Sequence, residues 1–296
     1  MKLTNEMNLP QPLVSAVEND PYTNGGADIS VTALLNPPRQ KVLERIHSDE
    51  ITEDASDRIW SLMGQVVHGI LERANTESVA ERRLYTEVLG WKVSGGMDAY
   101  YEHGLVQDYK VTTAYKFKNN SVPEQFEQQL NLYAHILRSN GHKVTKLEVV
   151  GILRDWSVME AKRDPNFPKK QVVVLEVPLW PEEKARAFLY GRVKLHQEAL
   201  RVLPLCSDED RWGKPRVYAV MKPGRKTAVK LHDSEQFAKN HAASEEGLYV
   251  VERPQSFIRC ENYCRVANFC SQYKETLTKS NASPDGFTLT TIKGVI

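Results

Sequence analysis

The sequence has little net charge, few cysteines and no long hydrophobic run, and each shortage excludes a class of protein. The formal net charge is +1, from 39 lysines and arginines against 38 aspartates and glutamates. A strongly basic field over the whole molecule is therefore excluded, and a polyanion would have to be bound by a local patch. No apolar segment approaches the length of a membrane-spanning helix, and residues 1–20 lack the apolar core of a signal peptide. We therefore expect a cytoplasmic protein that does not bind membranes.

Cysteine is scarce, and the four cysteines are poor disulfide candidates in a cytoplasmic protein. Cys260, Cys264 and Cys270 fall within one short stretch, whereas Cys206 stands alone. Free cysteines are often simply small buried residues, but this clustering favours a structural metal site with Cys206 as the fourth ligand. Four thiolates suit either a [4Fe–4S] cluster or tetrahedral zinc, and the sequence leaves both open.

The middle of the chain alternates between apolar patterns of helical period and short β-branched runs. Helices are expected over 40–46, 54–75, 123–139 and 181–203. Strands are expected over 84–89, 91–101, 105–113, 146–156 and 171–178, with His103-Gly104 as a hairpin turn. The helix over 123–139 should bury one stripe, formed by Phe126, Leu130, Tyr133, Ala134 and Leu137. This order predicts an α/β fold with a central mixed sheet flanked by helices.

Both ends of the chain differ in character from this middle part. Residues 1–28 are polar and contain three prolines and the pair Gly25-Gly26, which indicates an irregular arm. After Pro204, the pattern predicts a small β-β-α-β unit, with strands over 217–222, 227–232 and 248–253 and a helix ending near Ala243. Residues 271–296 are polar, and we expect a loosely held tail.

Five polar side chains follow one another through the expected hairpin and the next helix. Asp98 and Asp108 lie on the two strands, and Lys110 shares a strand face with Asp108 because side chains two apart point the same way. Gln129 and Tyr133 are one helical turn apart. A carboxylate beside an ammonium can bind a hard divalent cation and offset negative charge developing at phosphorus. Taken alone, Asp108 and Lys110 would be solvated surface charges; the ordered set favours a phosphoryl-transfer site.

Four short motifs carry a resemblance to a known family. They are Gly64-Gln65-Val66-Val67-His68, Gly96-Met97-Asp98, Asp108-Tyr109-Lys110 and Gln129-Leu130-Asn131-Leu132-Tyr133. In this order they resemble the PD-(D/E)XK nuclease superfamily, and most of all its RecB-like branch, which includes phage exonucleases and the nuclease of the CRISPR adaptation module. The resemblance implies a restriction-endonuclease-like core. Taken alone, His68 would be an ordinary core or surface histidine.

The resemblance also implies roles for individual residues. Asp98, Asp108 and the Tyr109 carbonyl would hold Mg²⁺ or Mn²⁺, and His68 and Glu87 would complete one or two metal sites. A metal-bound water would attack the phosphodiester in line.

The remaining roles fall to side chains that hold no metal. Lys110 would orient the attacking water and offset charge on the phosphorane. Gln129 would bond near Lys110 or the scissile phosphate, and Tyr133 would contact the strand backbone.

Several RecB-like relatives carry an iron–sulfur cluster on three C-terminal cysteines and one N-terminal cysteine. Pro37 stands at the N-terminal position here, so Cys206 would supply the fourth ligand of a clasp that fastens the chain's end to the core. Four segments are expected: an irregular arm (1–28), the nuclease domain (29–203), a small α+β unit with the cysteine cluster (204–275) and a tail (276–296).

The sequence thus predicts a metal-dependent deoxyribonuclease of the kind used in phage recombination or genome processing. Because the implied contacts are to phosphates, we expect an exonuclease or end-processing enzyme with little sequence specificity, acting on single- or double-stranded DNA. Two alternatives remain: a non-catalytic nucleic-acid-binding module on the same fold, and a metal-bearing scaffold that recruits a helicase or recombinase.

Overall fold

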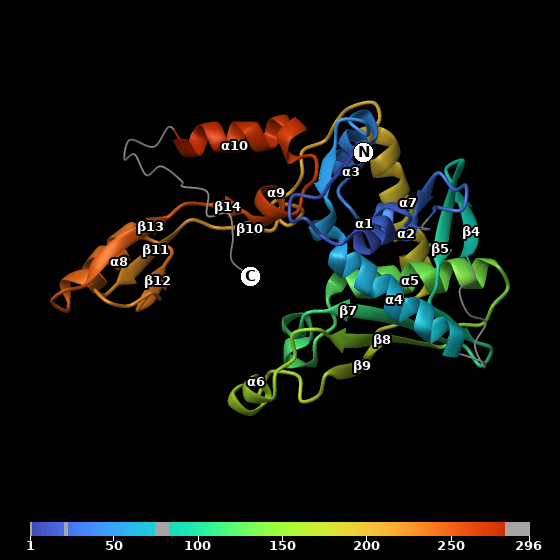
Figure 1. Ribbon diagram of the computed structural model, residues 1–296, viewed down its shortest axis with the longest axis horizontal. Helices are drawn as coiled ribbons and strands as arrows, with labels where there is room; N and C mark the ends of the chain where they lie inside the picture. The colour runs from blue at the N-terminus through green and yellow to red at the C-terminus, as the bar shows by residue number, and fades with distance from the viewer. Residues whose placement is uncertain (1, 21–22, 75–82, 282–296) are drawn as a thin grey trace. The chain divides into compact units, whose positions relative to one another are not determined.

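The computed structural model describes residues 2–20, 23–74 and 83–281. The chain divides into two compact units (Figure 1), one formed by Met1–Val42 with Asp49–Leu203 and the other by Leu43–Ser48 with Pro204–Ile296. None of the helices within the described ranges has the length and apolar character needed to cross a membrane.

The first unit contains a four-stranded sheet in the order β6-β7-β8-β9. Its strands are β6 (Ala99–Tyr101), β7 (Leu105–Thr112), β8 (Lys146–Leu153) and β9 (Val172–Val177). Strands β7 and β8 are parallel, whereas β6 and β9 run antiparallel to their neighbours. The hairpin between β6 and β7 turns at Gly104, whose φ of +103° suits glycine. The expected α/β fold with a mixed sheet is therefore confirmed.

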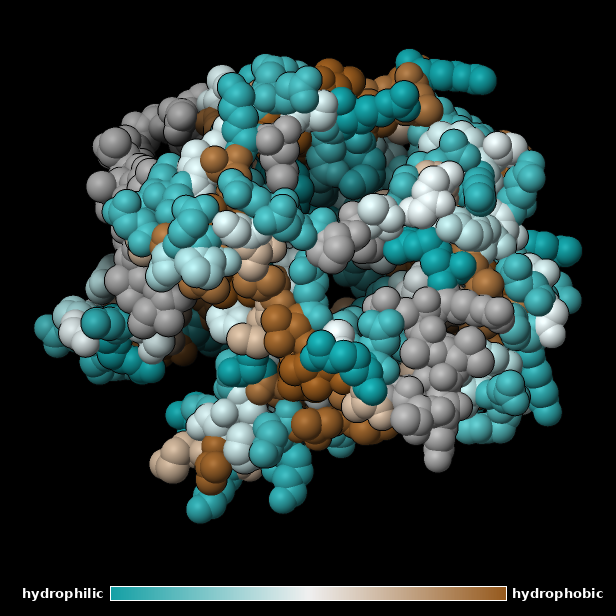
Figure 2. Space-filling view, turned by 45° about the vertical axis from the view of Figure 1, so that its right-hand side comes forward, coloured by the Kyte–Doolittle hydropathy of each residue, from teal (hydrophilic) through white to brown (hydrophobic). Residues whose placement is uncertain are grey.

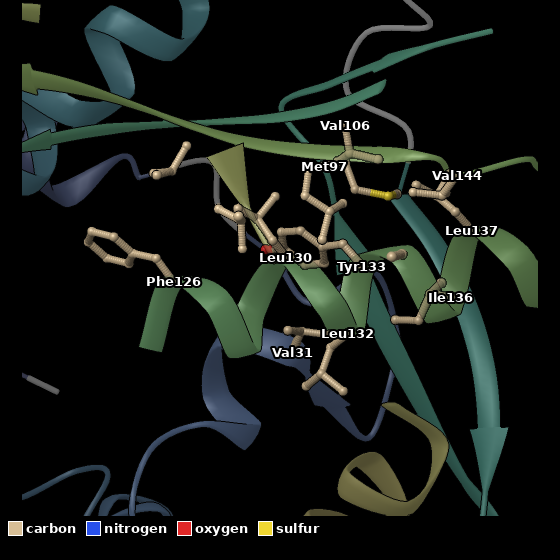
Figure 3. Close-up of a cluster of buried hydrophobic side chains, with 14 of the residues drawn as sticks. Val31, Met97, Val106, Phe126, Leu130, Leu132, Tyr133, Ile136, Leu137 and Val144 are labelled. Carbon is tan, nitrogen blue, oxygen red and sulfur yellow. The ribbon is translucent and has the colours of Figure 1, made fainter. Parts of the chain in front are cut away.

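Helix α5 (Glu124–Ser139) makes the crossover between β7 and β8 and is the centre of the core. In Figure 3, Leu130 and Tyr133 lie on the side of the helix that faces Met97 and Val106, while Leu132 points toward Val31 on the other side of the helix. The predicted buried stripe is confirmed, but burial extends around the helix because α2 (Val31–Leu34) and α7 (Glu182–Ala199) pack on its other side.

A second, three-stranded sheet has the order β2-β5-β4. Its strands are β2 (Ile29–Ser30), β5 (Trp91–Gly96) and β4 (Arg83–Val88). Ser30 caps α2, since its hydroxyl accepts a hydrogen bond from the Ala33 N–H at 3.2 Å. The end of α2 is fastened to α7, where Arg192 Nη2 donates to the Leu34 carbonyl at 2.6 Å.

Helix α4 (Ile59–Ala74) follows the 3₁₀ turn η1 (Ala55–Arg58), and none of its side chains is fully buried. Trp60, Met63, Val66 and Ile70 are all exposed, and Figure 2 shows apolar residues gathered in a band where α4 crosses the lower half of this face. The helix was therefore predicted correctly from its apolar period, but the apolar side chains of α4 are exposed at the surface rather than buried. The helix packs on β7 through a narrow edge.

The prediction of an irregular arm over 1–28 was wrong for two of its segments. Strand β1 (Lys2–Thr4) pairs in parallel with β3 (Thr52–Asp54), and α1 (Gln11–Glu18) buries Val14 and Val17. Pro10 and Pro12 stand at the cap and first turn of α1, where a missing N–H leaves no hydrogen bond unmade. The prolines that suggested irregular structure instead begin a helix. In the loop expected between 156 and 171, the chain forms α6 (Val158–Arg163).

The second unit has the expected β-β-α-β order. Its strands β11 (Val217–Met221), β12 (Lys230–His232) and β13 (Tyr249–Arg253) form an antiparallel sheet in the order β12-β11-β13, with α8 (Glu235–Ala243) on one face. The remaining elements are β10 (Gly213–Lys214), β14 (Ser256–Phe257), α3 (Pro38–Ile46, which joins the two units in sequence), α9 (Ile258–Asn262), η3 (Ala267–Phe269) and α10 (Ser271–Asn281).

The expected loose tail over 276–296 is corrected in part, because residues 276–281 belong to helix α10. Residues 282–296 lie outside the described residues. The helix begins directly after Cys270, and the Lys274 N–H donates to the Cys270 carbonyl at 3.1 Å. A polar composition therefore did not exclude regular structure here.

The core position of α5 predicts a large effect of truncation at Leu130, which is completely buried. Changing Leu130 to Ala should lower the free energy of unfolding by about 2–5 kcal/mol, measured by urea denaturation. The matched control is Leu195→Ala on α7, where the leucine is 47% exposed and the change should stay within about 0.5 kcal/mol. Equal effects in the two variants would contradict this assignment of the core.

Candidate active site

Strand β7 brings Asp108 and Lys110 together on the face that packs against α5. Asp108 is 2% exposed, and its Oδ2 atom lies 2.6 Å from Lys110 Nζ. This contact is an ion pair without hydrogen-bond geometry, since Oδ2 has no hydrogen-bond partner that meets the usual angles. The alternation of β7, which buries Val106 and Asp108 in turn, places the pair against the core as the spacing predicts.

Burial is the main electrostatic feature of this pair. It raises the pKa of Asp108 to about 6, and Asp98 adds to the rise while Lys110 opposes it. Burial would lower the pKa of Lys110, but the carboxylate of Asp108 outweighs it, so that pKa lies above its ordinary value. Lys110 therefore stays charged, and Asp108 is an acid that gains or loses its proton near neutral pH.

Asp98 lies beside the pair, in a bend between β5 and β6 that interrupts the strand expected over 91–101. Its Oδ2 accepts a hydrogen bond from the Tyr109 N–H at 2.7 Å, and its Oδ1 lies 3.1 Å from His68 Nδ1. His68 reaches over from α4, and its Nε2 lies 3.0 Å from the Tyr109 carbonyl. The hydrogen bond to Asp98 raises the pKa of His68. With acceptors at both ring nitrogens, the imidazolium form is favoured.

Gln129 and Tyr133 of α5 share a face as predicted and bond to one another. Gln129 Nε2 donates to the Tyr133 hydroxyl at 2.6 Å. Burial raises the pKa of Tyr133 to about 12, with Asp108 as the next cause, so this hydroxyl stays protonated beside the ion pair. A Cβ at Gly95 would lie 3.1 Å from the Tyr133 ring, which explains why β5 carries glycine where α5 crosses it.

Glu87 does not join these residues, and its predicted place in the metal site was wrong. It is exposed on β4, where it pairs with Lys92 across the hairpin. Arg83, not Glu87, is the β4 residue opposite Gly96, the end of β5 nearest to Asp98. Lys92 lies six residues before Asp98 in the chain, which is roughly 20 Å if the segment is fully extended. The hairpin register therefore directs Glu87 away from the site.

Three residues near the site had no motif to reveal them. Lys116 lies in the irregular 3₁₀ segment η2 (Ala114–Asn120), and its Nζ, like that of Lys110, is 5.4 Å from the centre of the Phe126 ring. Arg154 follows β8 and stacks on Trp60 of α4. A lone lysine in a loop and an arginine after a strand carry no sequence signal, because only folding sets them beside β7.

The donor set around β7 is chemically suited to a hard cation, since it offers two carboxylates, a backbone carbonyl and an imidazole. In the structure, the Oδ2 atom of Asp108 is paired with Lys110 Nζ, so a cation bound by this atom would share it with the ammonium group. As placed, however, His68, Asp98 and Tyr109 bond to one another. Among the residues that the structure describes, no three His, Cys, Asp or Glu side chains stand ready around a common metal position. A bound cation would therefore have to displace the proton shared within the His68 network.

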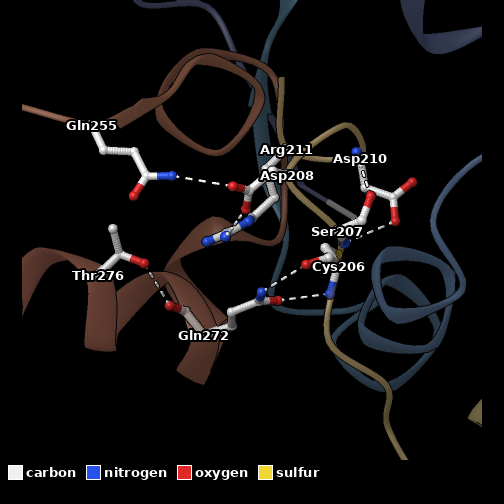
Figure 4. Close-up of polar contacts among 8 residues, drawn as sticks. All are labelled: Cys206, Ser207, Asp208, Asp210, Arg211, Gln255, Gln272 and Thr276. Atoms are coloured by element: carbon white, nitrogen blue, oxygen red, sulfur yellow. Dashed lines mark hydrogen bonds and ion pairs between the residues drawn. The ribbon is translucent and has the colours of Figure 1, made fainter. Parts of the chain in front are cut away.

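The four cysteines lie in the second unit. Burial raises the pKa of Cys260 to about 11, and the neighbouring thiols of Cys264 and Cys270 add to the rise. Cys206 is tied to α10 through its backbone, where Gln272 accepts from its N–H at 2.8 Å and donates to its carbonyl at 2.9 Å (Figure 4). Cys264 and Cys270 therefore influence the Cys260 thiol, whereas the four-thiolate site stays a prediction.

The electrostatics of Asp108 predict opposite responses to two substitutions. In metal-free protein with ¹³C-labelled aspartate, the Asp108 carboxyl should titrate with a pKa of about 6. Changing Lys110 to Ala removes a favourable charge and should raise that pKa, whereas Asp98→Asn removes an unfavourable one and should lower it. Shifts in the same direction, or a wild-type titration near the ordinary value of about 3.9, would contradict this description of the site.

Comparison with known proteins gives only distant structural likenesses. No family model matches the chain, and no curated protein matches it. The crystal structure of SSO0001 aligns with a TM-score of 0.43 and 18% identity, covering 62% of this chain and 84% of the other. A "Putative exonuclease" from Eubacterium rectale aligns with a TM-score of 0.29 and 13% identity, covering 52% and 60%. With both TM-scores below 0.5, neither likeness identifies a family for this chain.

Proposed function

We propose that the protein is a metal-dependent nuclease of the PD-(D/E)XK type, with Asp98, Asp108 and Lys110 as its central residues. The observation that carries this proposal is the buried ion pair on β7, with Asp98 and the Tyr109 carbonyl beside it. A buried charge pair contributes little to stability compared with apolar residues of the same volume. Its presence next to a second carboxylate is better explained by chemistry at a phosphate.

Mg²⁺ or Mn²⁺ would be held by Asp98, Asp108 and the Tyr109 carbonyl, with His68 as a further ligand, and would supply a bound water of lowered pKa and a counter-charge for phosphate. The protein's own contribution is positioning and charge. Asp108, with its raised pKa, is neutral in part without a cation and would ionise fully beside one. Lys110 stays charged and offsets negative charge at phosphorus. The Gln129–Tyr133 hydrogen bond holds these two α5 side chains in place beside the Asp108–Lys110 pair.

These residues suit DNA as the substrate, and they would hydrolyse its phosphodiester bonds. Cleavage should depend little on sequence, because the proposed contacts are to phosphate groups rather than to bases. The same proposal includes exonuclease or end-processing activity of the phage recombination type. It also includes a cytoplasmic location and a helicase or recombinase partner. The alternative, a non-catalytic binding module on the same fold, would not need a buried carboxylate–ammonium pair.

We also propose that Cys260, Cys264 and Cys270 hold a structural [4Fe–4S] cluster or zinc ion together with Cys206. Support comes from Cys260 and Cys264, whose thiol pKa values are raised by burial and further by neighbouring thiols, and from Gln272, which ties the Cys206 backbone to the helix that follows Cys270. Such a site would close a long loop of chain, where a metal stabilises most.

The nuclease proposal predicts that Asp108→Ala and Lys110→Ala each lower the rate of DNA cleavage by at least ~10²–10³-fold, in keeping with the loss of a transition-state contact. The measurement is cleavage of end-labelled linear and circular DNA, single- and double-stranded, with Mg²⁺ or Mn²⁺. Circular dichroism checks the fold, and Asp108→Asn, which preserves side-chain volume, replaces the alanine variant if that variant unfolds.

The matched control is Glu87→Gln, because Glu87 is a carboxylate on a neighbouring strand that lies away from the site. It should cleave at the wild-type rate. Wild-type rates in both Asp108 and Lys110 variants would contradict the nuclease proposal at these positions.

The cysteine proposal predicts metal in protein purified without oxygen. An iron–sulfur cluster should give a brown protein with broad visible absorption, and zinc a colourless one with stoichiometric metal by elemental analysis. Cys264→Ser should lower stability more than the cleavage rate of the folded fraction, because the thiols lie outside the carboxylate site. Protein with neither metal and with four freely titrating thiols would show that these are ordinary core cysteines.

A further inference from the structure

Trp60 is unusually exposed for a tryptophan beside a candidate active site. It lies on the first turn of α4, two helical turns before His68, and is 54% exposed. The guanidinium carbon of Arg154 lies 4.0 Å from the centre of its ring, which leaves the rest of the ring to solvent. A large aromatic surface left in water forgoes the free energy of burial, so this ring is available to a partner.

Arg154 is fixed next to the catalytic strand. Its N–H donates to the carbonyl of Thr112 at 3.0 Å, at the end of β7 that carries Lys110. The side chain is therefore held between the α4 surface and the end of the strand. An arginine stacked on an aromatic ring keeps its N–H groups at the rim, where they can bind phosphate.

Lys116 adds a third positive charge at this edge. Partial burial of its ammonium, followed by the charges of Lys110 and Arg154, lowers the pKa of Lys116, so the three cations lie close enough to repel one another. Asp155, the nearest acid in sequence, accepts a hydrogen bond from the Ala114 N–H at 2.7 Å. Within the described residues, neither Lys116 nor Arg154 has a carboxylate within ion-pair distance. Uncompensated cations of this kind suit an anionic ligand.

The distance along α4 from His68 to Trp60 fits a DNA strand that extends from the carboxylate site toward Trp60. Eight residues of helix separate Trp60 from His68, or about 12 Å, which corresponds to three or four nucleotide steps at about 3.4 Å each. A strand whose phosphate lies at Asp108 and Lys110 could therefore place later phosphates on Lys116 and Arg154 and a base on Trp60.

We propose that the substrate is single-stranded DNA or an unpaired DNA end, with a base stacked on Trp60 and neighbouring phosphates bound by Arg154 and Lys116. This inference rests on the proposed nuclease function and narrows its substrate. In a duplex every base face is covered by its neighbours, whereas an unpaired base offers a free face that an aromatic ring can bind regardless of sequence.

The test is binding of a fluorescent single strand of about 15 nucleotides, and of the same sequence as a duplex, to the full chain in EDTA. Trp60→Ala should weaken single-strand binding about 10-fold and leave duplex binding nearly unchanged. Trp60→Phe should largely retain affinity because it keeps a ring. The matched control is Phe237→Ala on α8, which removes another exposed aromatic residue and should have no effect.

The phosphate contacts are tested separately. Arg154→Gln and Lys116→Gln should each reduce the slope of log affinity against log salt by about 0.7 for the single strand. These variants also guard against loss of folding in Trp60→Ala, because they remove exposed charges only.

Unchanged single-strand binding in Trp60→Ala, or equal weakening for single strand and duplex, would overturn the inference. If wild-type protein then still cleaves DNA in a manner that depends on Asp108, the nuclease proposal stands without it. If single-strand binding needs Trp60 but no Asp108-dependent cleavage occurs, the binding surface is supported and the nuclease proposal falls. If the wild-type protein binds neither probe, the inference falls, and the nuclease proposal is decided by the cleavage assay alone.

Discussion

The ion pair between Asp108 and Lys110 sets the conditions for the rest of the first unit. Both side chains leave β7 on the face that packs against α5, so a carboxylate is held in a region that is otherwise apolar. Removing either partner would leave the other charge buried and unpaired, which proteins tolerate poorly. The pair therefore depends on the alternation of side-chain direction along β7, which places both residues on one face. It also depends on α5, which covers that face.

The structure around the pair is built to hold it from several elements at once. Asp98 comes from the bend after β5, His68 from α4, and the Tyr109 amide and carbonyl from β7 itself. Behind them, Tyr133 and Gln129 form part of a helix that is buried on both sides. A site held by four elements can keep its geometry although one of its members, α4, lies largely at the surface.

A near-neutral chain can still present a basic edge, because net charge says little about the placement of individual charges. Lys110, Lys116 and Arg154 gather at one end of β7, and Arg154 lies over the exposed ring of Trp60. The same surface carries the apolar stripe of α4. A single nucleic acid strand presents charged phosphates and aromatic bases, and this edge offers a contact for each.

Much of this arrangement was fixed by the sequence itself. The period of two on β7 placed Asp108 beside Lys110, the period of 3.6 placed Gln129 beside Tyr133, and Gly104 marked a turn. These features depend on residues that are close in the chain, so local geometry is enough to predict them.

Only the tertiary structure decided which elements meet. Glu87 sits on the expected strand, but the register of its hairpin carries it away from Asp98, and no local pattern encodes that register. The apolar stripe of α4 has the period of a buried helix and yet is exposed, because a period identifies a face and not what covers it. Arg154 and Trp60 are separated in the chain by five strands and helix α5, so their contact is set by the packing of distant elements and no local sequence pattern predicts it.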